Sequence, residues 1–164
     1  MTQEEIVIKR LREKNYKFSS AESCTGGLLI STLINVPGAS QVIDEGFITY
    51  ANEAKIKYLS VKKETLEQKG AVSEETACEM AHGLYQFTKA QVTVSTTGIA
   101  GPDGGTKEKP VGTVYVGCCV CGQVYVKHLQ LHGDRISIRS QTVTAALKFI
   151  TDCLFDHENS LITS

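Results

Sequence analysis

The part of the sequence that decides the fold begins with Lys17-Phe18-Ser19-Ser20-Ala21 and continues as Glu22-Ser23-Cys24-Thr25-Gly26-Gly27. The first five residues have the character of a strand, and the next six form a turn of small residues. An apolar stretch, Leu28–Val36, follows and stops at Pro37-Gly38. The sequence therefore predicts a strand, a loop and the N-terminus of a helix, which is a unit of an α/β sheet.

Strands and helices alternate through the first two thirds of the chain. Helices are expected where apolar residues recur every three or four positions, and strands where β-branched and aromatic residues cluster. A hairpin around Gly122 and a last helix from near Asp134 complete the pattern. The other predicted elements are a helix from Thr2 to about Asn15, the strand Phe47–Tyr50, the helix Glu53–Leu59 capped by Asn52, the helix Glu64–Lys69, a helix capped by Ser73 and the strand Val92–Ser95.

Length and composition agree with one globular domain. The chain has 164 residues, of which 41% are hydrophobic and 21% are charged. One domain usually takes about 100–200 residues. We expect residues 1–164 to form a single domain, a three-layer α/β/α fold with a mixed, mostly parallel sheet.

The charge and hydropathy of the chain bear on whether it binds nucleic acid or a membrane. The chain carries 17 basic and 18 acidic residues, for a net charge of −1, so no nucleic-acid partner is expected. No apolar run reaches the roughly 18 residues of a membrane helix, and the acidic N-terminus does not match a secretory signal. These features predict a cytoplasmic protein without a membrane partner and leave open whether it forms a homo-oligomer.

Two loops of small residues follow predicted strands and are candidates for substrate binding. Loops at the carboxyl ends of strands line the ligand crevice of an open α/β sheet, and glycine lets backbone N–H groups approach an anion. Neither loop carries a known nucleotide fingerprint, and two tight turns without a ligand are the simpler alternative. The candidates are Ser23, Thr25, Gly26 and Gly27 in the first loop, and Thr97, Gly98 and Gly101 in the second.

Ser40, Tyr50 and Lys55 form a candidate catalytic group. A serine hydroxyl needs an adjacent base, and a desolvated lysine can serve while a tyrosine relays the proton. Short-chain dehydrogenases use the same residue types, but with three residues between tyrosine and lysine, whereas four separate Tyr50 from Lys55. Without further information, the simpler interpretation of Lys55 is a solvated lysine on a helix.

A third pattern imitates a metal site. Cys118 and Cys121 are followed by His128 and His132, but only six residues separate the two pairs, where about 12 are usual in a zinc finger. All four lie in alternating, strand-like sequence. We therefore expect the cysteines to fill the sheet core and the chain to use neither a metal nor another cofactor.

Seven motifs follow one another along the chain. They are Glu22-Ser23-Cys24-Thr25-Gly26-Gly27, Pro37-Gly38-Ala39-Ser40, the run from Gly46 to Lys55, Gly70-Ala71-Val72-Ser73, the run from Thr97 to Gly105, the run from Lys109 to Val114 and Gly133-Asp134-Arg135. Taken together, these motifs closely resemble the CinA C-terminal domain family, in its stand-alone form, over about residues 4–156. The resemblance implies the family's fold and the hydrolysis of the carboxamide of nicotinamide mononucleotide to nicotinate mononucleotide and ammonia, without a metal.

Matched position by position, the resemblance implies that Ser40 is the nucleophile, Lys55 the general base and Tyr50 the residue that positions or relays the proton. The mononucleotide phosphate needs an anion site of its own, for which the first loop and Arg135 are candidates. The alternative is a catalytically silent nucleotide-binding or interaction module of the same fold, associated with competence or DNA damage.

Overall fold

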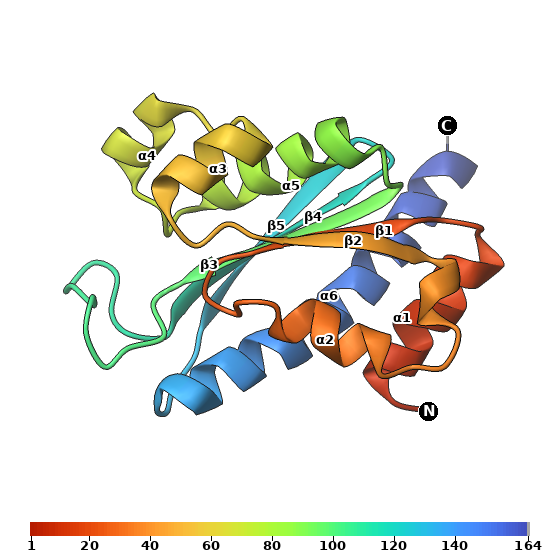
Figure 1. Ribbon diagram of the computed structural model, residues 1–164, viewed down its shortest axis with the longest axis horizontal. Helices are drawn as coiled ribbons and strands as arrows, with labels where there is room; N and C mark the ends of the chain where they lie inside the picture. Colours follow the sequence, from red (N-terminus) through yellow and green to blue (C-terminus); the bar gives the residue numbers. More distant parts are fainter. Residues whose placement is uncertain (164) are drawn as a thin grey trace.

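A five-stranded sheet lies between two layers of helices in the computed structural model, which describes residues 1–163 (Figure 1). The strand order is β2-β1-β3-β4-β5. The first three strands in this order are mutually parallel, and β4 is antiparallel to both of its neighbours, so the mixed sheet is confirmed. The strands are β1 (Phe18–Glu22), β2 (Ile43–Ile48), β3 (Val92–Gly98), β4 (Thr113–Val120) and β5 (Gln123–Gln130).

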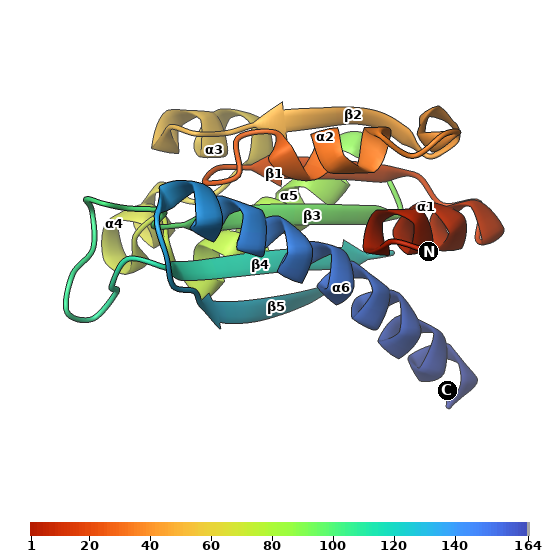
Figure 2. The ribbon, with the colours of Figure 1, turned by 90° about the horizontal axis from the view of Figure 1, so that it is seen from below.

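Within residues 1–163 the α-helices divide into two groups of three, one on each face of the sheet, as predicted for a three-layer fold (Figure 1). Figure 2, the view from below, shows α6 crossing obliquely in front of the strands, starting at the end of the sheet where the loop after β3 projects. No helix within residues 1–163 is long and apolar enough to cross a bilayer. The first layer holds α1 (Gln3–Glu13), α2 (Leu28–Ile34) and α6 (Arg135–Ile162), and the second holds α3 (Asn52–Leu59), α4 (Lys63–Lys69) and α5 (Glu74–Thr88).

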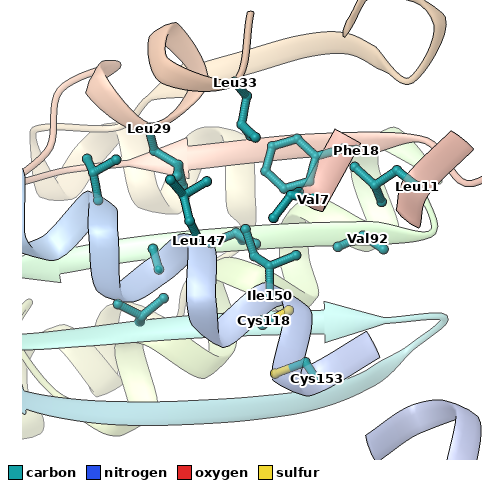
Figure 3. Close-up of a cluster of buried hydrophobic side chains, with 14 of the residues drawn as sticks. Val7, Leu11, Phe18, Leu29, Leu33, Val92, Cys118, Leu147, Ile150 and Cys153 are labelled. Carbon is teal, nitrogen blue, oxygen red and sulfur yellow. The ribbon is translucent and has the colours of Figure 1, made fainter. Parts of the chain in front are cut away.

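Each face of the sheet buries its own hydrophobic cluster. The larger cluster fills the space between the sheet and α1, α2 and α6, with Phe18, Leu29 and Ile150 fully buried (Figure 3). The smaller one, centred on Leu59 and Met80, joins α3, α4 and α5 to β1. Burying one such side chain stabilises the fold by about 1.5–3 kcal/mol, so both helical layers are held firmly against the strands.

Helix starts follow the sequence signals closely. Thr2 and Glu5 form the predicted capping box at α1, and the Ser73 and Asp134 side chains accept hydrogen bonds at the starts of α5 and α6. The prediction that Asn52 caps α3 is wrong. Ala51 occupies the cap position in an extended conformation without a side-chain hydrogen bond, and Asn52 is already helical.

The boundaries of β2 also differ from the prediction. The strand begins at Ile43 and ends at Ile48, whereas the sequence predicted residues 47–50. The difference arises because β2 pairs only with β1, and that pairing ends at Glu22 opposite Ile48. Thr49 and Tyr50 therefore lie beyond the strand, in the loop that connects β2 to α3.

The residues of the zinc-like pattern do not gather in one place. Cys118 is buried between β4 and α6, where Figure 3 shows it beside Cys153. Cys121 is exposed in the hairpin turn, and the His128 ring stacks on Tyr115 with 4.6 Å between centroids. Among residues 1–163 no three histidine, cysteine or acidic side chains form a group that could hold a metal ion.

Candidate active site

A cavity of about 200 Å³ lies at the carboxyl ends of the parallel strands. The loops after β1, β2 and β3 meet there, and the first residue of α6 reaches it from the side. Ligands of open α/β sheets bind at this edge, which makes the cavity the candidate active site. The lining residues are Ser23, Cys24, Tyr50, Lys55, Ala71, Val72, Thr97, Gly98, Ala100 and Arg135.

Lys55 is the buried amine of the cavity, with a relative exposure of 1%. Its ammonium group donates hydrogen bonds to Ser23 Oγ at 3.1 Å, to the Thr49 carbonyl at 2.8 Å and to the Tyr50 carbonyl at 3.1 Å. All three partners are uncharged oxygens. Burial lowers the pKa of Lys55 from its ordinary value, and the neighbouring Cys24 opposes this shift. Because a lower pKa makes the neutral amine easier to form, Lys55 is the candidate base of the cavity.

Ser23 is the hydroxyl that Lys55 contacts. The Ser23 amide donates to the Thr96 carbonyl at 2.9 Å, which fixes the backbone where β1 ends. The adjacent Cys24 is a poorer candidate nucleophile, because burial raises the pKa of its thiol to about 11 and keeps it protonated near neutral pH. The pair that can perform nucleophilic chemistry is therefore Ser23 and Lys55.

The N-terminus of α2 is already occupied by a carboxylate of the chain itself. The Glu22 side chain is buried and accepts backbone hydrogen bonds from Gly27 at 3.0 Å, Leu29 at 3.0 Å and Ile30 at 2.9 Å. The sequence interpretation missed this role. The sequence does carry a signal for this role: an acidic residue stands directly before a small-residue turn and a helix, and helix N-termini attract anions.

This occupancy corrects the substrate-binding prediction for Thr25, Gly26 and Gly27. The Thr25 hydroxyl is buried against Glu22 Oε2 at 2.6 Å, the Gly26 amide donates to the Ser23 carbonyl and the Gly27 amide donates to Glu22. None of these three residues lines the cavity. Of the first-loop candidates, the structure brings only Ser23 to the site.

Arg139 holds the same loop through two of its carbonyl groups. Its guanidinium, on α6, donates to the Cys24 carbonyl at 3.0 Å and to the Thr25 carbonyl at 2.9 Å. Sequence reasoning missed this residue, although its position one helical turn after Arg135 places both arginines on one side of α6. The loop that carries Ser23 is therefore fixed through its amides by Glu22 and through its carbonyls by Arg139.

Arg135 and Tyr50 meet at the mouth of the cavity. Arg135 donates to the Tyr50 hydroxyl at 3.2 Å and to the Gly101 carbonyl at 2.9 Å. The Tyr50 side chain is 63% exposed, and the hydrogen bond between Tyr50 and Lys55 uses the Tyr50 carbonyl instead of the phenol. The phenol therefore belongs to the entrance, and the direct proton relay that the sequence suggested does not match its hydrogen bonding.

The second predicted loop contributes through two of its three candidates. Thr97 and Gly98 line the cavity, and the Thr97 hydroxyl donates to the Ala71 carbonyl at 2.7 Å. That bond secures the segment containing Ala71, which forms the apolar wall of the site. Gly101 does not line the cavity, and its carbonyl accepts a hydrogen bond from Arg135.

Ser40 lies at the other end of the sheet from Lys55, so the prediction that the two share a site is wrong. Ser40 is exposed in the short helix Ala39–Gln41, before β2 begins, whereas Tyr50 and Lys55 follow the end of β2. A strand from residue 43 to residue 48 separates its ends by about 16 Å. Ser40 instead borders a different cavity, between α2 and β2.

Comparison with known proteins agrees with this fold. The model of the CinA C-terminal domain matches residues 1–154. The chain belongs to the CinA C-terminal domain family. A CinA-like protein from Kosmotoga olearia is 55% identical over 151 residues, and a protein from Clostridium novyi described as competence-damage inducible is 55% identical over 150 residues. Both alignments cover 92% of this CinA domain but only 37% and 36% of the relatives, so the chain spans about a third of their length.

Solved structures of the CinA family superimpose over nearly the whole domain. A competence/damage inducible protein from Agrobacterium tumefaciens is 41% identical, with a TM-score of 0.89 and coverage of 92% of both chains. A CinA superfamily protein from Escherichia coli is 36% identical, with a TM-score of 0.86, covering 89% of this CinA domain and 85% of that chain. The similarity therefore covers at least 85% of each chain in both comparisons.

Proposed function

We propose that this CinA domain is a metal-independent amidohydrolase that converts nicotinamide mononucleotide to nicotinate mononucleotide and ammonia. The observation that carries the proposal is the hydrogen bond between the buried Lys55 amine and Ser23 Oγ. A lysine with a lowered pKa beside a serine hydroxyl is a base with its nucleophile. The resemblance to the family supplies the substrate, and the geometry favours Ser23 over Ser40 as the nucleophile.

In the first half of the reaction, neutral Lys55 takes the Ser23 proton while Ser23 Oγ bonds to the carboxamide carbon. The resulting tetrahedral intermediate collapses as protonated Lys55 gives its proton to the departing nitrogen, which leaves as ammonia. An ester between Ser23 and the nicotinoyl group remains. In the second half, Lys55 takes a proton from water, the hydroxide attacks the ester, and the acid leaves as the proton returns to Ser23.

The Gly98 amide is the proposed donor to the oxyanion. On β3, the Thr96 carbonyl faces β1, where it accepts from Ser23, and the Ile99 amide faces β4, where it donates to Thr113. Because successive peptide groups of a strand alternate in direction, the Gly98 amide faces the β1 side, beyond the last residue of β1. One such donor is worth about 2.7–4 kcal/mol in other enzymes.

Arg135 is the proposed partner of the substrate phosphate. It stands at the mouth of the cavity, so a nucleotide whose carboxamide reaches Ser23 would extend its ribose phosphate toward it. A guanidinium has five N–H donors, and the bonds to Gly101 and Tyr50 use two of them. Arg135 thus keeps donors for a bidentate contact with phosphate.

The decisive experiment incubates the purified protein with nicotinamide mononucleotide in EDTA and measures ammonia and nicotinate mononucleotide. We expect the two products in a ratio of one to one. If neither forms, the proposal fails in favour of a catalytically silent module, a function in keeping with relatives named for competence and damage induction.

A further inference from the structure

We infer that Glu22 is a positioning residue that fixes the geometry of Ser23 and Lys55, an inference that rests on the proposed function. Glu22 immediately precedes Ser23, is 1% exposed and does not line the cavity. It therefore cannot touch a substrate. Two chains of hydrogen bonds nonetheless connect Glu22 with the pair: one runs from its side chain through Thr25 and Thr96 to the Ser23 amide, and the other runs from its carbonyl through Thr49 to the Lys55 ammonium.

The Glu22 carboxylate gathers donors from both sides of Ser23. Before Ser23, the Ser20 hydroxyl donates to Oε1 at 3.2 Å. After Ser23, the Thr25 hydroxyl donates to Oε2 at 2.6 Å, and the Gly27 and Leu29 amides donate to the same oxygen. The Ile30 amide donates to Oε1. A buried carboxylate is tolerated only when its oxygens are satisfied. These five donors satisfy it, and in turn they fold the Ser23 turn around it.

The hydrogen-bond network extends from Glu22 through Thr25 to Thr96 on β3. The Thr25 and Thr96 hydroxyls lie 2.7 Å apart. Since Thr25 gives its proton to the carboxylate, the proton between the two hydroxyls comes from Thr96. The Thr96 carbonyl accepts from the Ser23 amide. The carboxylate therefore orders a chain of contacts that ends at the backbone of the proposed nucleophile.

The main chain of Glu22 reaches Lys55 by a second route. The Glu22 carbonyl accepts from the Thr49 amide at 3.0 Å, and the Thr49 carbonyl accepts from the Lys55 ammonium at 2.8 Å. Displacing Glu22 would thus move Ser23 and Lys55 relative to each other. Catalysis is sensitive to such changes, because a misplacement of about 1 Å can lower a rate by about 10²-fold.

Glu22→Gln tests the inference with almost no change in shape. One carboxylate oxygen becomes an NH₂ group, which must face groups that are themselves donors. We expect kcat to fall by about 10²-fold while KM changes by less than about twofold, because the cavity wall stays intact. Covalent labelling of Ser23 by phenylmethanesulfonyl fluoride, a reagent for activated serines, should slow in parallel with kcat.

Thr93→Val is the matched control. Thr93 is also buried on the sheet, and its hydroxyl donates to the Ala81 carbonyl at 2.7 Å, near the end of β3 that is remote from Ser23. Both variants lose buried hydrogen bonding and thermal stability. Only Glu22→Gln should lose kcat at a temperature where both are folded. Unchanged kcat in folded Glu22→Gln would overturn the inference, since a purely structural role predicts that result.

Thr25→Val decides the question if Glu22→Gln does not fold. It removes one donor to the carboxylate and the link to Thr96, but leaves the α2 amides in place. We expect kcat to fall about tenfold with KM unchanged, and an unaltered kcat would overturn the inference. A wild-type protein that neither releases ammonia nor is labelled at Ser23 would refute the proposed function itself, so the two failures are distinguishable.

Discussion

The Lys55 ammonium nitrogen lies 3.1 Å from the Ser23 hydroxyl oxygen, although the two residues are 32 positions apart in the sequence. The parallel pairing of β1 and β2 brings them together. Ser23 directly follows β1, and Lys55 lies on α3, the helix that follows the neighbouring β2. Because parallel strands end at the same edge, the end of each strand delivers one member of the pair to the same point.

Replacing Ser23 by alanine should abolish amide hydrolysis without unfolding the domain. The hydroxyl is the proposed nucleophile, and its loss leaves only binding and the oxyanion donor. We expect the rate of ammonia release to fall by at least about 10³-fold. Ser40→Ala is the control, since it removes an exposed hydroxyl at the opposite end of the sheet. Loss of activity in Ser40→Ala with retention in Ser23→Ala would reverse the assignment.

The pH dependence of the reaction should report the Lys55 amine. Burial lowers the pKa of Lys55, and only the neutral amine can accept the Ser23 proton. We expect kcat/KM to rise with pH through an apparent pKa below the usual value of about 10.4. Lys55→Arg should be inactive at every pH, because a guanidinium does not deprotonate in this range. A flat wild-type profile between about pH 6 and 9 would count against Lys55 as the base.

The same buried amine should make folding stability depend on pH. The pKa of Lys55 is lower in the folded protein than in the unfolded chain, so the unfolded state binds more protons between the two pKa values. The contribution of Lys55 to the free energy of unfolding therefore increases as the pH rises through that window. In urea titrations, the free energy of unfolding of the wild type should increase relative to that of Lys55→Met as the pH increases toward about 10. A difference that stays constant with pH would indicate a normal lysine.

The fold was predictable from the sequence because its signals are local. Capping residues mark the starts of α1, α5 and α6, and the α5 stripe Ala77, Met80, Ala81 and Leu84 is fully buried as its spacing predicts. Cys121 and Gly122 form the predicted hairpin turn, and both have a positive φ. Each of these features depends on residues within a few positions of one another.

The site was predictable only in part, because its geometry depends on contacts between distant segments. The sequence predicts that Lys55, Tyr50, Ser23 and Arg135 belong to the site, but it places the nucleophile at Ser40, because nothing local distinguishes Ser40 from Ser23. The distinction depends on the end of the sheet at which each residue lies: Ser40 precedes β2, whereas Ser23 follows β1 at the end where Lys55 lies. The anion site on α2 also could not be judged from the sequence, since its occupant depends on how the buried Glu22 side chain folds back.

Arg135→Ala should separate recognition of the phosphate from the chemistry. If Arg135 binds the substrate phosphate, the variant should lose about tenfold or more in kcat/KM on nicotinamide mononucleotide. On nicotinamide riboside, which has no phosphate, it should match wild type within about twofold. Steady-state kinetics on both substrates measure this. Equal losses on the two would assign Arg135 to support of Tyr50 and Gly101, the groups to which it donates in the structure.

Gly83→Ala should destabilise the domain by pushing α5 away from the helix that carries Lys55. Gly83 lies on α5 where α3 crosses it, and an added Cβ would come within 1.7 Å of the Leu59 carbonyl oxygen. Because that obstacle is backbone, the helices must separate, at a cost of about 1–3 kcal/mol or more. Gln86→Ala, on the exposed side of α5, makes the same helix more alanine-rich without a clash and should leave the melting temperature unchanged or slightly raised. Thermal unfolding measures the melting temperatures of the two variants. If Gly83→Ala had the melting temperature of the wild type, α3 would not be packed as closely against α5 as the structure has it.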